Sequence, residues 1–140
     1  MTSRLGKSIG IVVTNTAVLL NSSINKKLQP FGIAIEQRAI LEIIMNKGCI
    51  KQTELTTILC RDRTTISRTL KTLENKDYIK KEKIDNKIFM IKLSEKGIDV
   101  MEKTQDIVNE FRNNILSNFT EDEIDNLYAY LEKIQDIVKE

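Results

Sequence analysis

The sequence predicts a mostly helical fold that carries one small β-hairpin. Apolar residues recur at helical spacing through most of the 140 residues, and only between positions 78 and 93 do they alternate with lysines. With 41% hydrophobic residues, the chain has enough apolar side chains for a core. It contains one proline and no Ser/Gly-rich linker. We therefore expect a single domain over residues 1–140.

The first helix is predicted over residues 5–28, where apolar side chains follow helical spacing from Leu5 to Leu28. The apolar run at 9–20 is too short and too polar for a membrane span, which needs about 20 apolar residues. No convincing signal-peptide cleavage site follows it. These features indicate a cytoplasmic protein that has no membrane partner.

Two further helices are predicted in the first half of the chain. Gln29 to Gly32 break the first helix, and a second helix follows over 36–46, where Ile40, Leu41 and Ile44 face inward. Lys47 and Gly48 end it. A short extended segment at 49–51 then leads to a third helix at 53–59, and residues 60–63 form a turn.

A fourth helix is predicted over residues 63–75, with Asp62 as its N-cap. Ile66, Leu70 and Leu73 lie on one stripe, whereas hydroxyls and cations gather on the opposite face. Thr and Ser are mediocre helix formers, so helix propensity does not explain this face. Such side chains can approach a polyanion and donate hydrogen bonds to phosphates and base edges. The alternative is an ordinary solvent-exposed helix.

The hairpin is predicted from strands at 78–83 and 87–93, with a turn at Asp85 and Asn86. Ser94 then caps a fifth helix that closes near Asn118. Thr120 and Glu123 form a capping box that opens a sixth helix. The apolar residues of this last helix repeat at alternating spacings of three and four, and such a narrow seam usually meets another helix.

Charge is distributed unevenly along the chain, although the net charge is only +2. Residues 51–87 hold ten Lys or Arg and six Asp or Glu, whereas residues 94–140 hold five and twelve. A polyanion should therefore meet the middle of the chain. The sequence contains no histidine, which excludes Ser-His and Cys-His catalysis. We expect no enzyme activity, no metal site and no cofactor.

The two cysteines, Cys49 and Cys60, are expected to be reduced thiols. The alternative is redox sensing, because Cys60 lies beside Arg61 and Arg63 and directly before a helix.

Helix, short strand, helix, turn, helix and hairpin is the order of a winged helix-turn-helix, whose last helix enters the major groove of DNA. Together with the basic middle and the hydroxyl-rich helix face, this order predicts binding to double-stranded DNA. A rival interpretation is a winged helix that serves protein or RNA contacts within a larger assembly.

The sequence resembles the MarR-type transcriptional regulators along nearly its whole length. LQPFGIAIEQRAIL at 28–41 is similar to the family's first loop and second helix, with Gln37 at a frequent Gln position. Residues 50–79 follow the family's helix-turn-helix, and LSEKG at 93–97 matches the signature that leaves the wing. Two positions depart from the pattern. Cys60 stands where the family most often has Gly, and Lys87 ends a wing motif that usually carries Arg.

The resemblance implies a homodimeric regulator, expected to be a repressor, on a pseudo-palindromic operator. Residues 33–94 would form the DNA-binding lobe, and 1–29 and 95–140 the dimerisation helices. The expected contacts of the recognition helix are Arg61, Arg63, Thr64, Thr65, Ser67, Arg68, Lys71 and Thr72. Those of the wing and the start of the third helix are Lys51, Gln52, Thr53, Lys83, Asp85, Asn86 and Lys87. The expected dimer residues are Leu5, Ile9, Val12, Ile124, Leu127, Leu131 and Ile134. The resemblance also implies relief by a small aromatic ligand. Relatives that sense oxidants use a Cys near the start of the first helix, which this chain lacks, so a redox switch would use Cys60 or Cys49 by a different geometry.

Overall fold

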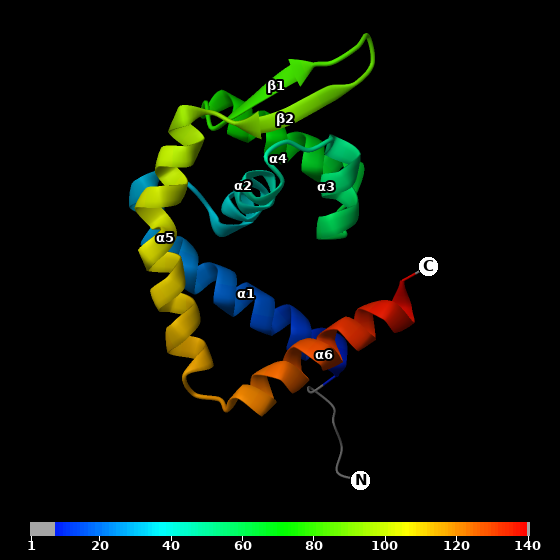
Figure 1. Cartoon of the computed structure of the whole chain (residues 1–140). Helices are drawn as coiled ribbons and strands as arrows, with labels where there is room; N and C mark the ends of the chain where they lie inside the picture. The colour runs from blue at the N-terminus through cyan, green and yellow to red at the C-terminus, as the bar shows by residue number, and fades with distance from the viewer. Residues whose placement is uncertain (1–7, 140) are drawn as a thin grey trace. The chain divides into compact units, whose positions relative to one another are not determined.

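The computed structural model describes residues 8–139, and within them the helices and strands follow the predicted order (Figure 1). The predicted winged helix-turn-helix, mostly helical with one hairpin, is confirmed. The elements are α1 (Ile9–Leu28), a 3₁₀ turn η1 (Gln29–Phe31), α2 (Ile35–Lys47), α3 (Gln52–Leu59), α4 (Arg63–Asn75), β1 (Ile79–Lys83), β2 (Phe89–Leu93), α5 (Glu95–Leu116) and α6 (Glu121–Val138). Leu5 lies outside the described residues. None of the described helices is long and apolar enough to cross a membrane.

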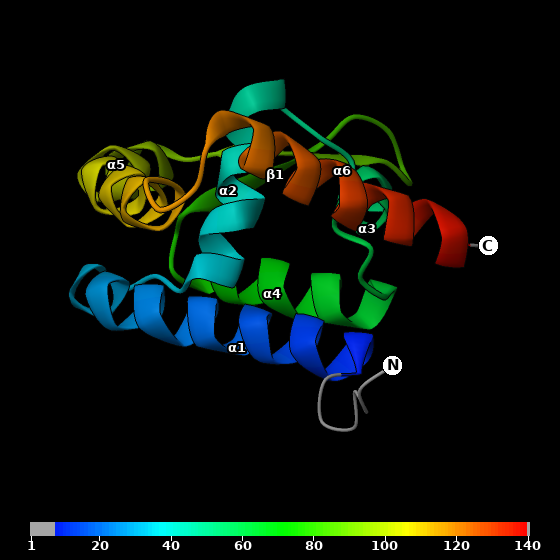
Figure 2. The ribbon, with the colours of Figure 1, turned by 90° about the horizontal axis from the view of Figure 1, so that it is seen from below.

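The chain divides into two compact units, and the boundary follows Gln105 within α5. The core of the first unit is built from α2, α3, α4 and the hairpin, together with the end of α1 and the first turns of α5. Ile40, Leu41 and Ile44 of α2 are buried as predicted, together with Leu55 of α3 and Leu70 of α4. Figure 2 shows α2 running across the directions of α1 and α4. The buried apolar residues of these helices together form the core of the first unit.

The hairpin is joined to the helices by a third extended segment. β1 and β2 pair antiparallel, with Ile79 opposite Leu93 and Lys83 opposite Phe89. Ile50 bridges Ile91 of β2 through two backbone hydrogen bonds of 3.0 and 2.8 Å. The extended segment predicted at 49–51 is thus confirmed at Ile50, whose bridge connects the end of α2 to the wing.

The loop between α1 and α2 is fixed by residues at the end of α4. Gly32 has a φ of +73°, a conformation in which glycine has no steric cost. Lys76 Nζ donates to the carbonyl oxygen of Gly32 at 2.9 Å and to Oε1 of Gln37 at 3.0 Å. Gln37 Oε1 also accepts from the backbone N–H of Ala34, at the start of α2. This network links the loop and α2 to the C-terminal end of α4.

The start of α5 explains the glycine of the LSEKG segment. Ser94 donates its backbone N–H to the carbonyl oxygen of Tyr78 at 3.0 Å, and its Oγ accepts from the N–H of Gly97 at 3.0 Å. Ser94 is therefore the N-cap that the sequence predicts. A Cβ added at Gly97 would collide with the Tyr78 carbonyl. Only glycine permits this close approach between α5 and the segment that opens β1.

The second unit contains the end of α5 and all of α6. Asn118 Nδ2 donates to the carbonyl oxygen of Asn114 at 2.8 Å, which closes α5. Thr120 Oγ1 accepts from the N–H of Glu123, and Glu123 Oε1 accepts from the N–H of Thr120. The predicted capping box is therefore confirmed as the start of α6.

Candidate nucleic-acid interface

One face of α4 is apolar and buried, and the other is polar and exposed. Ile66, Leu70 and Leu73 are at most 1% exposed, as their spacing predicts. The exposed residues of the opposite face and its leading edge are Arg63, Thr64, Thr65, Ser67, Arg68, Lys71 and Thr72. The helix is anchored through one stripe and presents hydroxyls and cations to solvent.

The turn that leads into α4 contains a strained residue. Cys60 adopts a left-handed conformation with φ 51° and ψ 39° and forms the C-cap of α3. This conformation is unfavourable for a residue with a Cβ and easy for glycine, which accounts for the Gly that the resemblance leads one to expect here. Cys49 and Cys60 are both free and exposed.

Asp62 occupies the N-cap position of α4 and accepts a hydrogen bond from the hydroxyl of Thr65. That hydrogen bond lowers the pKa of the Asp62 carboxyl below its usual value, and the positive charge of Arg68 adds to the effect. The hydroxyl hydrogen of Thr65 is consequently directed to Asp62 in the free protein.

The other hydroxyls of α4 differ in what they can offer a ligand. Thr72 Oγ1 donates to the Arg68 carbonyl at 3.1 Å, so its methyl group and acceptor lone pairs remain for external contacts. Within residues 8–139, the side chains of Thr64, Ser67 and Arg68 make no hydrogen bond. These three side chains are therefore free to donate to a nucleic acid.

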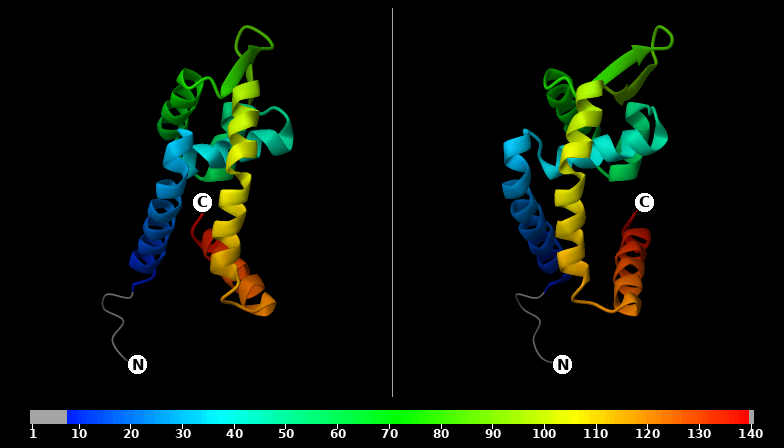
Figure 3. Two further views of the ribbon diagram at one scale, coloured as in Figure 1. Left: turned by 90° about the vertical axis from the view of Figure 1, so that its left-hand side faces the viewer. Right: turned by 60° about the vertical axis from the view of Figure 1, so that its left-hand side comes forward.

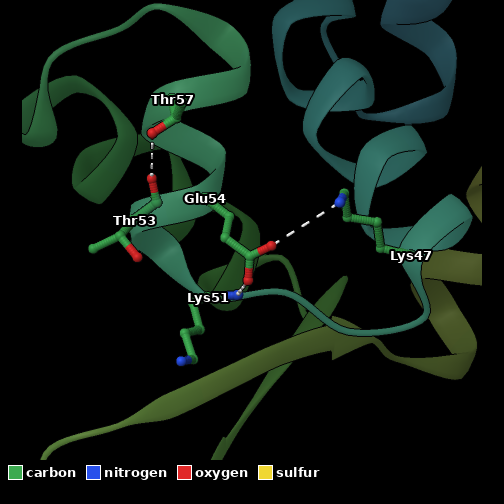
Figure 4. A network of polar contacts seen from close by, with 5 residues as sticks. All are labelled: Lys47, Lys51, Thr53, Glu54 and Thr57. Carbon is green, nitrogen blue, oxygen red and sulfur yellow. Dashed lines mark hydrogen bonds and ion pairs between the residues drawn. The ribbon is translucent and has the colours of Figure 1, made fainter.

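The start of α3 carries a small polar network (Figure 4). Glu54 Oε1 accepts from the backbone N–H of Lys51 at 3.3 Å, and its Oε2 lies 4.0 Å from Lys47 Nζ. Both partners of this ion pair are about half exposed, so the pair adds little to stability. In Figure 4 the Lys51 side chain points away from Glu54, which leaves the Lys51 ammonium available to an anion.

A cleft of about 300 Å³ lies between the starts of α3 and α4 and the hairpin. Its cations are Lys51, Arg63, Lys81 and Lys87, and Phe89 is among its apolar residues. The cleft brings together five residues that the sequence predicts as DNA contacts, namely Lys51, Gln52, Thr53, Arg63 and Lys87. Lys81 and Phe89 were not predicted, although the alternation of lysines in β1 was a signal for Lys81. The other predicted contacts do not line the cleft, namely Arg61, Thr64, Thr65, Ser67, Arg68, Lys71, Thr72, Lys83, Asp85 and Asn86.

The wing projects beyond the helices of the first unit (Figure 3). Its loop carries the predicted contacts Asp85, Asn86 and Lys87, and Lys83 ends β1 immediately before it; all four are exposed. Asp85 Oδ1 accepts from the backbone N–H groups of Lys87 and Ile88 at 2.8 and 2.9 Å. Residues 87 and 88 therefore belong to the turn, and β2 begins at Phe89 rather than at the predicted residue 87.

Exposed apolar side chains mark both helices in which the sequence predicts dimer contacts. Ile9 and Val12 of α1 are 62% and 46% exposed, and Leu127 and Leu131 of α6 are 44% and 36% exposed. Ile124 and Ile134 are half-buried. Several neighbours that the prediction omitted are also exposed, namely Val13, Val18, Leu19, Tyr128 and Tyr130.

Comparisons with known proteins agree with this fold. Residues 33–87 match the model of the MarR family. A cysteine-to-serine mutant of MarR from E. coli, solved in complex with operator DNA, is 24% identical with a TM-score of 0.80, over 90% of this chain and 92% of that one. The S. aureus MepR–DNA complex is 23% identical with a TM-score of 0.85, over 94% and 99%. AbsC, a MarR family transcriptional regulator from Streptomyces coelicolor, is 18% identical with a TM-score of 0.84, over 99% and 97%. No curated protein matches the sequence.

Proposed function

We propose that this chain is a transcriptional regulator of the MarR family that binds specific sites on double-stranded DNA. Members of this family are transcriptional regulators and not enzymes. The observation that carries the proposal is the exposed face of α4, where Thr64, Ser67 and Arg68 have uncommitted donors.

The dimensions and chemistry of α4 suit the major groove. Thirteen residues give a helix about 20 Å long, and an α-helix fits into the major groove of B-DNA. Arg68 would donate two hydrogen bonds to a guanine, and Thr64 and Ser67 would contact neighbouring base edges. Lys71 and the cationic cleft would contact phosphates, which fix the register of the protein without specifying sequence.

The functional unit in this proposal is a homodimer. Exposed apolar residues on α1 and α6 would be buried against a second copy of the chain, because a monomer gains nothing from exposing them. A two-fold dimer presents two copies of α4, and its operator would then be a pseudo-palindrome. Residues 33–94 would form the DNA-binding lobe of a single domain, with 1–29 and 95–140 as dimerisation helices.

The proposed mode of action is repression that a signal relieves. Two signals are compatible with the chain: a small aromatic ligand, and oxidation of Cys60 or Cys49. Structures of an organohalide-sensing regulator and of oxidised and reduced MarR are among the similar folds. Both thiols are exposed, and Cys60 is the better candidate because it forms the strained turn that leads into α4.

Selection of bound sequences from a random duplex pool would test this function. We expect enrichment of a pseudo-palindrome whose affinity falls steeply with salt, because several phosphates are neutralised in each half-site. Structured and single-stranded RNA of equal length serve as competitors. No enrichment of any sequence, or better competition by RNA, would favour the rival module for protein or RNA contacts.

A further inference from the structure

We propose that Asp62 makes Thr65 an acceptor-only contact in the major groove, so that Thr65 selects a base with an exocyclic amino group, adenine or cytosine, beside the contact of Arg68. This inference rests on the proposed DNA-binding function and adds the chemical class of base that one side chain of α4 selects. Asp62 is not among the DNA contacts that the sequence predicts, and it acts here as a positioning residue for Thr65.

The hydroxyl hydrogen of Thr65 is committed to a carboxylate. Thr65 Oγ1 donates to Oδ1 of Asp62, which occupies the N-cap position of α4 three residues earlier. The same hydrogen bond lowers the pKa of the Asp62 carboxyl, which is therefore ionised at neutral pH and can only accept hydrogen bonds. Because a hydroxyl has a single hydrogen, Thr65 has only acceptor lone pairs and a methyl group left for a ligand.

The other hydroxyls of α4 are not fixed in this way. Within the described part of the chain the side chains of Thr64 and Ser67 make no hydrogen bond, so each can rotate and match either an amino group or a carbonyl group of a base. Thr69 and Thr72 donate to backbone carbonyls, which are neutral acceptors. A hydrogen bond to a carboxylate is about twice as strong as one between neutral groups. Thr65 is therefore the hydroxyl whose polarity is set most firmly.

Thr65 lies where it can meet a base edge next to Arg68. Both side chains are exposed, and they stand three residues apart, which places them on the same side of the helix. The positive charge of Arg68 also contributes to the lowered pKa of Asp62, so the three side chains form one cluster. Arg68 can only donate hydrogen bonds, whereas Thr65 can only accept them from a ligand. The two residues therefore select bases by opposite criteria.

The fixed polarity of Thr65 gives the direction of the preference. In the major groove the N6 group of adenine and the N4 group of cytosine are donors, whereas guanine O6 and thymine O4 are acceptors. An amino group would donate to Thr65, and the hydrogen bond from Thr65 to Asp62 would strengthen this contact, because hydrogen bonds in a chain polarise one another. A carbonyl oxygen at the same place would face a second acceptor with no hydrogen between them, and both would lose water.

The test uses the full chain and the duplex obtained by selection. Each adenine of a half-site is replaced in turn by 2-aminopurine and each cytosine by 2-pyrimidinone, which removes the amino group from the major groove and retains pairing with the partner base. At one pair in each half-site we expect this deletion to lower the affinity of the wild type about tenfold. Thr65→Val keeps the shape of the side chain but has no acceptor, so it should bind the two duplexes within about twofold of each other.

Asp62→Ser tests the positioning role of Asp62. Serine is also a good N-cap, but its hydroxyl can donate to Thr65 as well as accept, so the polarity of Thr65 is no longer fixed. At the pair found by deletion, the amino base is exchanged for its carbonyl counterpart, with inosine·C in place of A·T or U·A in place of C·G. The wild type should lose more than about tenfold in affinity, whereas Asp62→Ser should bind both duplexes within about threefold.

Thr64→Val is the matched control, because it removes a neighbouring hydroxyl that no carboxylate holds. It should keep the wild-type response to both replacements at this pair, whatever its effect on a different pair. Thr65→Val should show no preference between the amino and carbonyl duplexes, which separates the contact of Thr65 from changes in the partner base.

Three outcomes would overturn the inference: an amino group that matters at no pair of the half-site, an amino requirement that persists in Thr65→Val, and an undiminished preference for the amino pair in Asp62→Ser. An amino requirement that Thr65→Val keeps and Asp62→Ser loses would show that the Asp62 carboxylate contacts the base itself. A wild type that binds no duplex selectively would instead contradict the proposed function, and the inference would fail with it.

Discussion

Arg38 of α2 and Thr104 of α5 are completely buried, and Arg38 Nε donates a hydrogen bond of 2.8 Å to Thr104 Oγ1. Nη2 of the same guanidinium donates to the Met101 carbonyl at 3.1 Å and to Gln105 Oε1 at 3.0 Å. Arg38 thus contacts the last turn of α5 that belongs to the first unit. Removing water from a charged guanidinium is costly. The stability of the fold therefore depends on each hydrogen-bond acceptor that replaces this water around Arg38.

We expect Thr104→Val to lower the free energy of unfolding by about 1–3 kcal/mol, because Nε of Arg38 loses its acceptor in a site that excludes water. Urea unfolding at neutral pH measures the change. The control is Thr57→Val on the exposed surface of α3, which should change stability by less than about 0.5 kcal/mol. Equal stability of Thr104→Val and wild type would mean that the hydrogen bond is dispensable.

The pH dependence of stability should include a contribution from Asp62. Its pKa in the folded protein is lowered, chiefly by the hydrogen bond from Thr65. A carboxyl with a lowered pKa stabilises the fold above its unfolded pKa, and this contribution is lost as the pH falls through the folded value. NMR titration should therefore show a higher Asp62 pKa in Thr65→Val than in wild type. An identical pKa in the two proteins would remove Thr65 as the cause.

Leu131→Asp should convert the proposed dimer into monomers, because an unpaired carboxylate would be buried in the interface. Sedimentation equilibrium reports the mass, and DNA affinity should fall with it. Lys133→Asp is the control on the same helix, since Lys133 is exposed two residues away and should leave the dimer intact. A Leu131→Asp protein that still sediments as a dimer would place the interface elsewhere.

Mild peroxide should weaken operator binding by wild type and leave Cys60→Ser unaffected, if Cys60 is the redox switch. Peroxide would oxidise the Cys60 thiolate to a sulfenate, with water as the other product. The added oxygen would enlarge a side chain in the strained turn before α4 and tilt that helix. Cys49→Ser, run in parallel, tests the other exposed thiol. Loss of affinity in oxidised Cys60→Ser, or retention in oxidised wild type, would exclude this switch.

Much of the helix-turn-helix was predictable, because local signals there agree with the tertiary structure. The spacing of Ile66, Leu70 and Leu73 and the N-cap at Asp62 fix both the bounds and the buried face of α4. The Thr120–Glu123 capping box of α6 and the Gly48 stop of α2 act in the same local way. Strand ends were less predictable, since the Asp85 hydrogen bonds that extend the turn are a property of the folded loop.

The burial of Arg38 could not be predicted from the sequence. Arginine is rarely fully buried, and the partners of this one lie 63 to 67 residues away on α5. Sequence patterns also cannot distinguish a threonine that offers its hydroxyl from one that uses it internally. Thr65 and Thr64 look alike in the sequence, but only Thr65 donates to Asp62.

The contact between Arg68 and the operator is the most direct test of DNA recognition by α4. Affinities of wild type and Arg68→Ala for the selected duplex and for a scrambled duplex are measured at matched salt. The account predicts a loss of about 1–3 kcal/mol on the selected duplex, a smaller loss on the scrambled one and therefore a reduced specificity ratio, with unchanged thermal stability. Unchanged affinity and an unchanged ratio would contradict recognition through this face of α4.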